Sequence, residues 1–307
     1  MNDSLLSIEK LSVEFKTELG SVKALKEVSF DVPYSSITAV VGESGSGKSV
    51  TSNAIMRLLP DSAQTSGKII LRPQDREPIA INSLDERDPL MQELRGGLVS
   101  MVFQEPMTAL SPVHRIGDQV AEAVLCHRKV STEVALAETA AMLERVGLTD
   151  VESKMRMFPF EFSGGMRQRV IIAMALICNP QLLICDEPTT ALDVTIQAEI
   201  LVLIKSLQRK LNNSVLFITH DLGVVAQIAD RVVVMYDGQV METGTVRQVL
   251  KSPQHPYTLH LLSSMPGINS LVEQESSSAD WAEGAPMGPG TILGDAGEGR
   301  QVREFSK

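Results

Sequence analysis

The sequence contains few cysteines. Its 307 residues include three, Cys126, Cys178 and Cys185. Three cysteines at this spacing form neither a disulfide framework nor a metal-ligand set. Because two of them stand in apolar runs, we interpret all three as reduced, packed thiols.

Long apolar runs and an excess of basic residues are also missing. No run approaches the roughly 18 apolar residues of a membrane-spanning helix, and the start of the chain lacks the basic and apolar stretches of a secretion signal. We therefore expect a cytosolic chain. Lys and Arg number 28 against 38 for Asp and Glu, a net charge of −10. This balance argues against broad contact with nucleic-acid phosphates, which needs a basic face.

What is present is the ordinary composition of a soluble globular protein, with 43% hydrophobic and 21% charged residues. Its length allows a sizeable core and about two domain-sized units. Apolar and polar residues alternate over residues 11–15 and 28–32, which predicts a small antiparallel layer. The later apolar runs that end in Asp186 and His220 are typical of strands buried in a parallel sheet.

Between residues 105 and 162 the hydrophobic period becomes helical, which predicts a helical insert. The two expected faces are Ile116, Val120, Val124 and His127, and then Leu136, Ala140, Leu143 and Val146. Farther along, residues 231–244 predict a hairpin that turns at Asp237 and Gly238. From about Pro266 the composition predicts a weakly ordered tail.

Residues 42–49, GESGSGKS, have the spacing of a phosphate-binding loop. An apolar run precedes the loop and a helical pattern follows it, as the chemistry requires; a flexible glycine turn is the disfavoured alternative. Lys48 is expected to reach the β- and γ-phosphates, and the Ser49 hydroxyl to ligate Mg²⁺. The predicted nucleotide-binding residues of the loop are Gly42, Ser44, Gly45, Gly47, Lys48 and Ser49. The face expected of the following helix comprises Val50, Ala54, Ile55, Leu58 and Leu59.

Two carboxylates stand where the apolar run LLIC ends. Asp186 suits the Mg²⁺ shell of a phosphate-loop enzyme. Glu187 suits a general base that activates water for attack on the γ-phosphate. We expect the two side chains to point to opposite sides, because neighbouring residues alternate in an extended chain. An acidic turn after a strand is the alternative, which the upstream phosphate loop disfavours.

Three residues are weaker candidates when taken alone. A histidine in the position of His220 is more often structural, but ligands of α/β sheets bind beyond the carboxyl ends of the strands. Gln104 follows an apolar stretch and could bridge metal and water, although it is also an ordinary polar loop residue. Phe15 lies on a predicted strand of alternating apolar and polar residues. Packing in the core is the favoured interpretation of its side chain, and stacking on an adenine is the more specific alternative.

Ser163, Gly164 and Gly165 precede a helical pattern. Serine is a favourable N-cap, and the positive end of the helix favours an anion. The segment is therefore a candidate for a second anion-binding site, which we call the Ser163 cradle. Taken alone, a capped helix start without a ligand is the favoured interpretation.

Together these motifs resemble the nucleotide-binding subunit of ATP-binding cassette (ABC) transporters, over about residues 6–266. In chain order they are residues 42–49, Gln104, Ser163-Gly164-Gly165, LLICDE, Asp193 of TALD, and His220. The resemblance implies a P-loop NTPase (RecA-like) fold with a mostly parallel sheet, and it implies that Phe15 stacks on adenine and Gln104 senses the γ-phosphate and binds the metal. It also implies that His220 is the catalytic switch histidine, that Asp193 belongs to the nucleotide-binding D-loop, and that the Ser163 cradle clamps ATP held by a partner's loop.

The resemblance divides the chain into four expected segments. Residues 1–104 and 166–252 would form the two parts of the ATP-binding core. Residues 105–165 would form the helical subdomain with the signature, and residues 253–307 a divergent, partly disordered extension.

Several segments narrow the resemblance to the ATP-binding subunits of bacterial oligopeptide and dipeptide importers, a subgroup that also serves nickel and other small solutes. These segments are FQEPMTALSP, SGGMRQRVIIAMAL, DEPTTALDVT and HPYTLHLLSSMP. The chain departs from the general signature at Phe162, usually leucine, and at Met166, usually glutamine. Many members bind an iron–sulfur cluster in a cysteine-rich C-terminal segment; because no cysteine follows Cys185, we expect no cluster.

The resemblance implies an ATPase that uses ATP and Mg²⁺ at the cytoplasmic face of the bacterial inner membrane. Its expected partners are a second ATPase subunit, identical or homologous, two permease subunits and an extracytoplasmic solute-binding protein, and no nucleic acid. The alternative is a soluble ABC-type ATPase that acts on nucleic acid or the ribosome without a permease.

Overall fold

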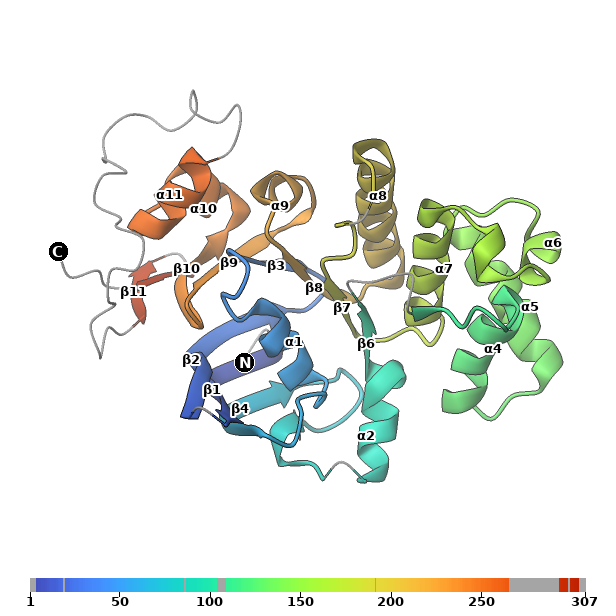
Figure 1. The fold of residues 1–307 in the computed structure, drawn as a ribbon, viewed down its shortest axis with the longest axis horizontal. Helices are drawn as coiled ribbons and strands as arrows, with labels where there is room; N and C mark the ends of the chain where they lie inside the picture. The colour runs from blue at the N-terminus through green and yellow to red at the C-terminus, as the bar shows by residue number, and fades with distance from the viewer. Residues whose placement is uncertain are drawn as a thin grey trace. The chain divides into compact units, whose positions relative to one another are not determined.

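A computed structural model gives the fold of the chain (Figure 1) and describes residues 4–18, 20–85, 87–103, 109–190, 192–264, 293–297 and 299–303. The chain divides into two compact units. The first comprises Met1–Asn82 and Phe217–Lys307, and the second comprises Ser83–Leu216. Among the described helices, none has both the length and the apolar character needed to cross a bilayer.

The first unit contains a four-stranded sheet in the order β2-β1-β4-β5. β1 pairs antiparallel with both β2 and β4, and β4 pairs antiparallel with β5. Leu11 lies opposite Val28, and both side chains are fully buried. The alternating pattern therefore forms the predicted antiparallel layer. The strands are β1 (Ser4–Thr17), β2 (Gly20–Pro33), β4 (Ala63–Leu71) and β5 (Ile79–Ala80).

A second sheet of the first unit has the order β11-β12-β10-β9-β3. β3 is parallel to β9 and buries all five of its side chains, as a central strand of an α/β fold does. β9 and β10 form the predicted hairpin, in which Asp237 and Gly238 have φ values of 45° and 71°. Two such residues make a hairpin turn that matches the strand twist. The strands are β3 (Ile37–Val41), β9 (Arg231–Tyr236), β10 (Gln239–Thr245), β11 (Leu293–Gly297) and β12 (Arg300–Arg303).

The helix after the phosphate loop ends earlier than its sequence pattern predicted. It stops at Ile55, and Leu58 is 42% exposed. Arg57 has a φ of 54°, and the N–H of Leu58 donates to the C=O of Asn53 at 2.8 Å. This left-handed cap closes the helix. The helices of the first unit are α1 (Lys48–Ile55), α9 (Leu222–Ile228), α10 (Val246–Lys251) and α11 (Pro256–Ser263), and the short turn η1 (Ile81–Ser83) crosses the unit boundary.

A buried ion pair joins the C-terminal strand β12 to β10. Glu242 is 0% and Arg300 6% exposed, and the Arg300 guanidinium donates to the Glu242 carboxylate. The same carboxylate accepts the backbone N–H groups of Gln254 at 3.2 Å and His255 at 3.0 Å. The charge of Glu242 is thus both paired and hydrogen-bonded, as burial demands.

The buried imidazole of His255 makes the stability of the first unit dependent on pH. Burial, and then the charge of Arg303, lower the pKa of His255 to about 4, whereas an unfolded histidine titrates near 6.5. Between these values the unfolded chain binds a proton that the folded chain does not. The free energy of unfolding should therefore fall by about 2 kcal/mol from this group between pH 7 and pH 5.

Urea unfolding of His255→Asn at both pH values tests this expectation. Nδ1 of His255 caps α11 by accepting the N–H of Tyr257 at 3.1 Å, and asparagine is also a favourable N-cap. The variant should keep the cap and lose less stability than the wild type on acidification. Equal losses in the two proteins would contradict the assignment.

The second unit contains two parallel strands and a group of helices. β6 (Val99–Val102) pairs with β7 (Leu182–Asp186), and β8 (Ser214–Thr219) runs across the boundary into the first unit. Helices α4, α5 and α6 contact one another (Figure 1) and lie within residues 105–162, where the helical insert was predicted; α7, which contacts α4 and α5, begins after those residues. The helical segments of this unit that lie wholly within the described residues are α2 (Pro89–Glu93), η2 (Leu94–Leu98), α4 (Ile116–His127), α5 (Thr132–Arg145), α6 (Val151–Met155), η3 (Pro159–Glu161), α7 (Gly164–Leu176) and α8 (Val194–Leu211).

The buried faces of α4 and α5 differ in part from the predicted ones. His127, at the end of α4, is exposed. In α5, Leu136 and Ala140 are only half-buried, whereas Thr139 is fully buried. α5 contacts α4, α6 and α7, so its buried face includes positions beside the apolar stripe. A pattern of apolar residues alone does not locate such a position.

The three cysteines lie in different environments. Cys185 is buried, and burial, followed by the charge of Asp186, raises the pKa of its thiol above the usual value. Cys178 is half-buried and donates to the C=O of Ala123 at 3.3 Å. Cys126 is exposed, so the prediction that it is a packed thiol is wrong.

Candidate functional site

The phosphate loop lies between the buried strand β3 and helix α1. Lys48 is 5% exposed, and its Nζ donates to the C=O groups of Gly42 at 2.8 Å and Glu43 at 2.7 Å. Gly47 begins α1 and has no side chain to cap the helix. An ammonium group at the centre of the loop and a helix N-terminus at its end both favour a phosphate.

Two glycines of the loop are required by packing. A Cβ on Gly42 would lie 2.1 Å from the C=O of Met235, and a Cβ on Gly47 would lie 2.6 Å from Cδ2 of Leu25. Gly47 also has a φ of 98°, which strains any side chain. The sequence motif therefore reflects both the path of the backbone and the room that neighbouring strands leave. The other predicted loop residues, Ser44, Gly45 and Ser49, are exposed.

Phe15 and His220 also belong to the first unit. Phe15 lies near the end of β1 and is half-buried, so it is not the core residue that spacing alone suggested. His220 follows β8 directly and is exposed. β8 neighbours β3 in the sheet. Adenine stacking by Phe15 and catalysis by His220 stay predictions.

In the second unit, β7 carries the two acidic residues to its end. Asp186 is the last residue of the strand and is 5% exposed. Glu187 has a φ of 46° and is therefore not extended. The premise of alternating side chains holds up to Asp186 and fails at Glu187. The Thr190 hydroxyl donates to Oε2 of Glu187 at 2.9 Å, which fixes the carboxylate.

The Ser163 segment begins α7 as predicted. Oγ of Ser163 accepts the N–H of Met166 at 3.3 Å, and both Ser163 and Gly164 are exposed. A Cβ on Gly165 would lie 2.8 Å from Cγ2 of Ile196, in α8. Gly165 is therefore required where α7 packs on α8, a cause that its sequence position did not reveal.

Asp193 caps α8, because its Oδ1 accepts the N–H of Ile196 at 3.0 Å. The next residue, Val194, is 83% exposed, an unusual position for a large apolar side chain.

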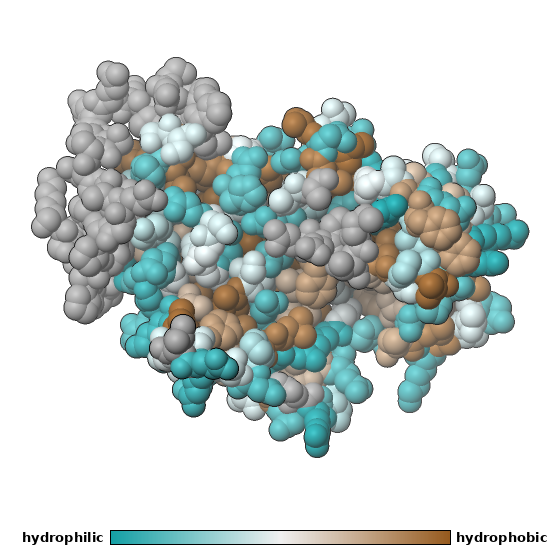
Figure 2. All heavy atoms as spheres, viewed as in Figure 1, coloured by the Kyte–Doolittle hydropathy of each residue, from teal (hydrophilic) through white to brown (hydrophobic). Residues whose placement is uncertain are grey.

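Figure 2 shows hydrophobic and hydrophilic residues interspersed over one face of the chain. Phe162, which replaces the usual leucine, is 3% exposed, so the apolar character of this position is kept. Gln104 lies outside the described residues.

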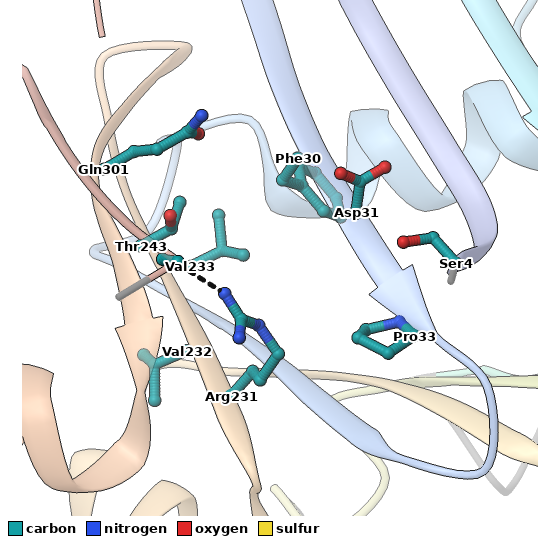
Figure 3. A pocket seen from close by; sticks show the side chains of 10 residues that line it. Ser4, Phe30, Asp31, Pro33, Arg231, Val232, Val233, Thr243 and Gln301 are labelled. Atoms are coloured by element: carbon teal, nitrogen blue, oxygen red, sulfur yellow. Dashed lines mark hydrogen bonds between the residues drawn. The ribbon is translucent and has the colours of Figure 1, made fainter. Parts of the chain in front are cut away.

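A cavity of about 380 Å³ lies elsewhere in the first unit (Figure 3). Arg231, Asp31 and Phe30 are among its lining residues. The guanidinium of Arg231 donates to the C=O of Gly299 at 2.7 Å. None of the predicted site residues lines this cavity, so the candidate site is the phosphate loop and not this hollow.

The residues present fit a nucleotide with its magnesium ion. No group of three or more His, Cys, Asp or Glu side chains gathers as a metal site within the described ranges. Magnesium in nucleotide sites needs only one or two protein ligands, because phosphates and water complete its shell. The predicted protein donors are the Ser49 hydroxyl, exposed on the first unit, the Asp186 carboxylate of the second unit, and Gln104, which lies outside the described residues.

A phosphate loop between a buried strand and a helix, on an α/β fold, defines a nucleotide-binding protein of the P-loop class. More narrowly, the family described as ABC transporter matches residues 25–190, more than half of the 307 residues. The chain therefore belongs to the ABC transporter family, as one of its ATP-hydrolysing cassettes. A second family, described as oligopeptide/dipeptide transporter C-terminal region, matches residues 241–283.

Individual proteins agree with this assignment. The chain is 51% identical over 273 residues to the oligopeptide transport ATP-binding protein OppD of Bacillus subtilis strain 168, covering 88% of this chain and 74% of OppD. It is 51% identical over 269 residues to the dipeptide transport ATP-binding protein DppD of the same strain, covering 87% of this chain and 78% of DppD. Its fold matches the dimeric, post-hydrolysis structure of the ATP-binding cassette MJ0796 with ADP and Pi, with 26% identity and a TM-score of 0.67 over 79% of this chain and 99% of that one.

Proposed function

We propose that this chain is the ATP-hydrolysing subunit of an importer that takes up peptides or a similar small solute across the bacterial inner membrane. The observation that carries the solute class is the match of residues 241–283 to the oligopeptide/dipeptide transporter C-terminal region. The 51% identity to OppD and DppD supports the same class. Two permease subunits and an extracytoplasmic binding protein complete the proposed system.

The proposed nucleotide site divides its tasks among the loop and strand ends. Lys48 binds the β- and γ-phosphates, and Phe15 stacks on the adenine. Ser49, Asp186 and Gln104 are the proposed Mg²⁺ ligands; the ion would neutralise charge on the phosphates. Glu187 accepts a proton from the attacking water, and His220 contacts the γ-phosphate or that water.

The exposed Ser163 cradle supports a dimer of ATPase subunits. Ser163 and Gly164 are exposed, and so is the apolar side chain of Val194 beside Asp193. The backbone of the Ser163 cradle can bind a phosphate, and the exposed Val194 can pack against an apolar side chain. Both features fit contact with a second ATPase subunit that carries a bound nucleotide. In the proposed dimer, each chain supplies its phosphate loop to one ATP and its Ser163 cradle to the other.

Uptake measurements in the source organism test the proposed solute class. Deletion of the gene should abolish the ATP-dependent import of a labelled tri- or tetrapeptide and leave import of the corresponding free amino acids unchanged. The wild-type gene should restore peptide import, and a Glu187→Gln copy should not. Unchanged import of peptides after deletion would overturn the assignment.

Affinity purification from detergent extracts separates this proposal from the soluble alternative. The tagged chain should copurify with two polytopic membrane proteins and a second ATPase subunit or a second copy of itself. Recovery of ribosomes or nucleic acid in their place would favour a soluble ABC-type ATPase.

A further inference from the structure

The C-terminal helix α11 touches the phosphate loop directly. The phenol oxygen of Tyr257 accepts the backbone N–H of Glu43 at 3.2 Å. Tyr257 is 0% exposed and is among the largest fully buried side chains of the described residues. Its ring lies 4.6 Å from the ring of Tyr236, at an angle of 46°. The hydroxyl is therefore held in place by a packed ring.

This hydrogen bond acts on the same peptide group that the loop lysine binds. The C=O of that peptide belongs to Gly42 and accepts from Nζ of Lys48 at 2.8 Å, while its N–H belongs to Glu43 and donates to Tyr257. One peptide plane is thus fixed from both sides. When the ammonium group turns towards a phosphate, the bond to Tyr257 remains to hold the plane.

The turn between β9 and β10 makes a second contact with the loop. The N–H of Gly238 donates to the C=O of Ser46 at 3.1 Å. Tyr236, which contacts the ring of Tyr257, is the last residue of β9 before this turn. The helix and the turn therefore support the loop at two points, Glu43 and Ser46.

The position of α11 depends in turn on the buried Glu242. The carboxylate of Glu242 accepts the N–H of His255, the residue that begins α11, and it also pairs with Arg300 of β12. The same guanidinium nitrogen of Arg300, Nη2, also donates to the C=O of Ser252 at 2.5 Å. Continuous contacts thus run from β12 through Glu242 and α11 to the phosphate loop.

We propose that Tyr257 is a positioning residue for the phosphate loop, and that the Arg300–Glu242 pair makes ATP affinity depend on the C-terminal strand β12. Tyr257 does not touch the reacting atoms. It fixes the plane that the loop presents in the resting state, with ATP bound and in the transition state alike. The inference depends on ATP binding alone and holds whatever solute the importer carries.

The variant Tyr257→Phe removes only the hydroxyl and keeps the ring. It leaves the N–H of Glu43 without its acceptor, so the loop of the free protein is no longer held in its ATP-binding orientation. ATP must then order the loop as it binds, and the KM for ATP should rise roughly three- to tenfold. Since the bond is made equally in the ground and transition states, kcat should stay within about twofold of wild type. ATPase kinetics and titration with a fluorescent ATP analogue measure both quantities.

Tyr34→Phe is the matched control. The hydroxyl of Tyr34 donates to the C=O of Arg72 at 2.6 Å, in the same unit, and the side chain of Tyr34 is half-buried. A merely structural role predicts the same result for both variants, namely lower thermal stability with unchanged KM. If Tyr257→Phe leaves KM unchanged while the protein is folded, the proposal is overturned.

Hydrogen exchange of the wild-type protein tests the same coupling without a variant. Addition of ATP should slow amide exchange in the phosphate loop and also in residues 256–264, because α11 is bonded to the loop. A conservative Arg300→Lys change, which keeps the charge, should weaken the protection of residues 256–264 and raise the KM in the same direction as Tyr257→Phe. Protection confined to the loop, or an unchanged KM in Arg300→Lys, would refute the role of the C-terminal strand.

Discussion

Glu187→Gln is expected to lower the ATPase rate by about 10²- to 10⁴-fold, the usual contribution of a general base, while ATP binding persists. Glutamine has the shape of glutamate and keeps an oxygen for the Thr190 hydroxyl, which donates to Oε2 of Glu187 at 2.9 Å in the wild type. It lacks the basicity to take a proton from water. Steady-state turnover and nucleotide titration measure the two properties separately, and size-exclusion chromatography with ATP should show a persistent dimer.

Glu144→Gln is a suitable control for the loss of one carboxylate. Glu144 lies on α5 in the same unit and is exposed. Its replacement should leave turnover within about twofold of wild type, because isolated surface charges contribute little. Turnover of Glu187→Gln near that of the control would show that the base lies elsewhere.

Lys48→Ala is expected to lower ATP affinity by at least about 100-fold. The ammonium group is almost fully buried in the loop, where hydrogen bonds to a charged group contribute about 1.5–3 kcal/mol each. Loss of two such bonds to phosphate oxygens corresponds to a change of about 10² or more in the dissociation constant. Titration with a fluorescent ATP analogue measures the loss, and circular dichroism checks that the variant is folded.

Lys26→Ala provides the contrast with an exposed lysine. Nζ of Lys26 lies 2.5 Å from Oδ2 of Asp237, with both side chains at least one-third exposed at 35% and 58%. A surface pair of this kind contributes little to stability, and the change should leave ATP affinity within about twofold of wild type. Wild-type affinity in Lys48→Ala would contradict the assignment of the loop.

The parts of the fold that the sequence predicted are those whose causes are local. The phosphate loop needs its glycines and lysine at fixed spacing, and Gly42 and Gly47 prove to have no room for a side chain. The hairpin at Asp237 and Gly238 follows from two residues that accept positive φ. In the loop and in the hairpin turn, the residues that predict the structure from the sequence are the same residues that determine its backbone conformation.

The parts that the sequence did not predict depend on distant partners. The left-handed backbone of Glu187 is a feature of the surrounding fold and not of glutamate, which rarely adopts it. Strand β12 contains one apolar residue, and its place is set by Arg300 pairing with Glu242, 58 residues away. The contact of Tyr257 with Glu43 spans 214 residues. No local period in the sequence carries such information.

The contact between Gly165 and Ile196 has a consequence for how this protein can vary. With a Cβ at position 165 only 2.8 Å from Cγ2 of Ile196, a larger residue there becomes tolerable only if position 196 shrinks. Substitutions at this contact are therefore coupled between α7, which Ser163 caps, and α8, which Asp193 caps. Random mutagenesis should recover substitutions at positions 165 and 196 together, as a compensating pair. Redesign of the N-terminal part of α7 therefore requires a matching change in α8.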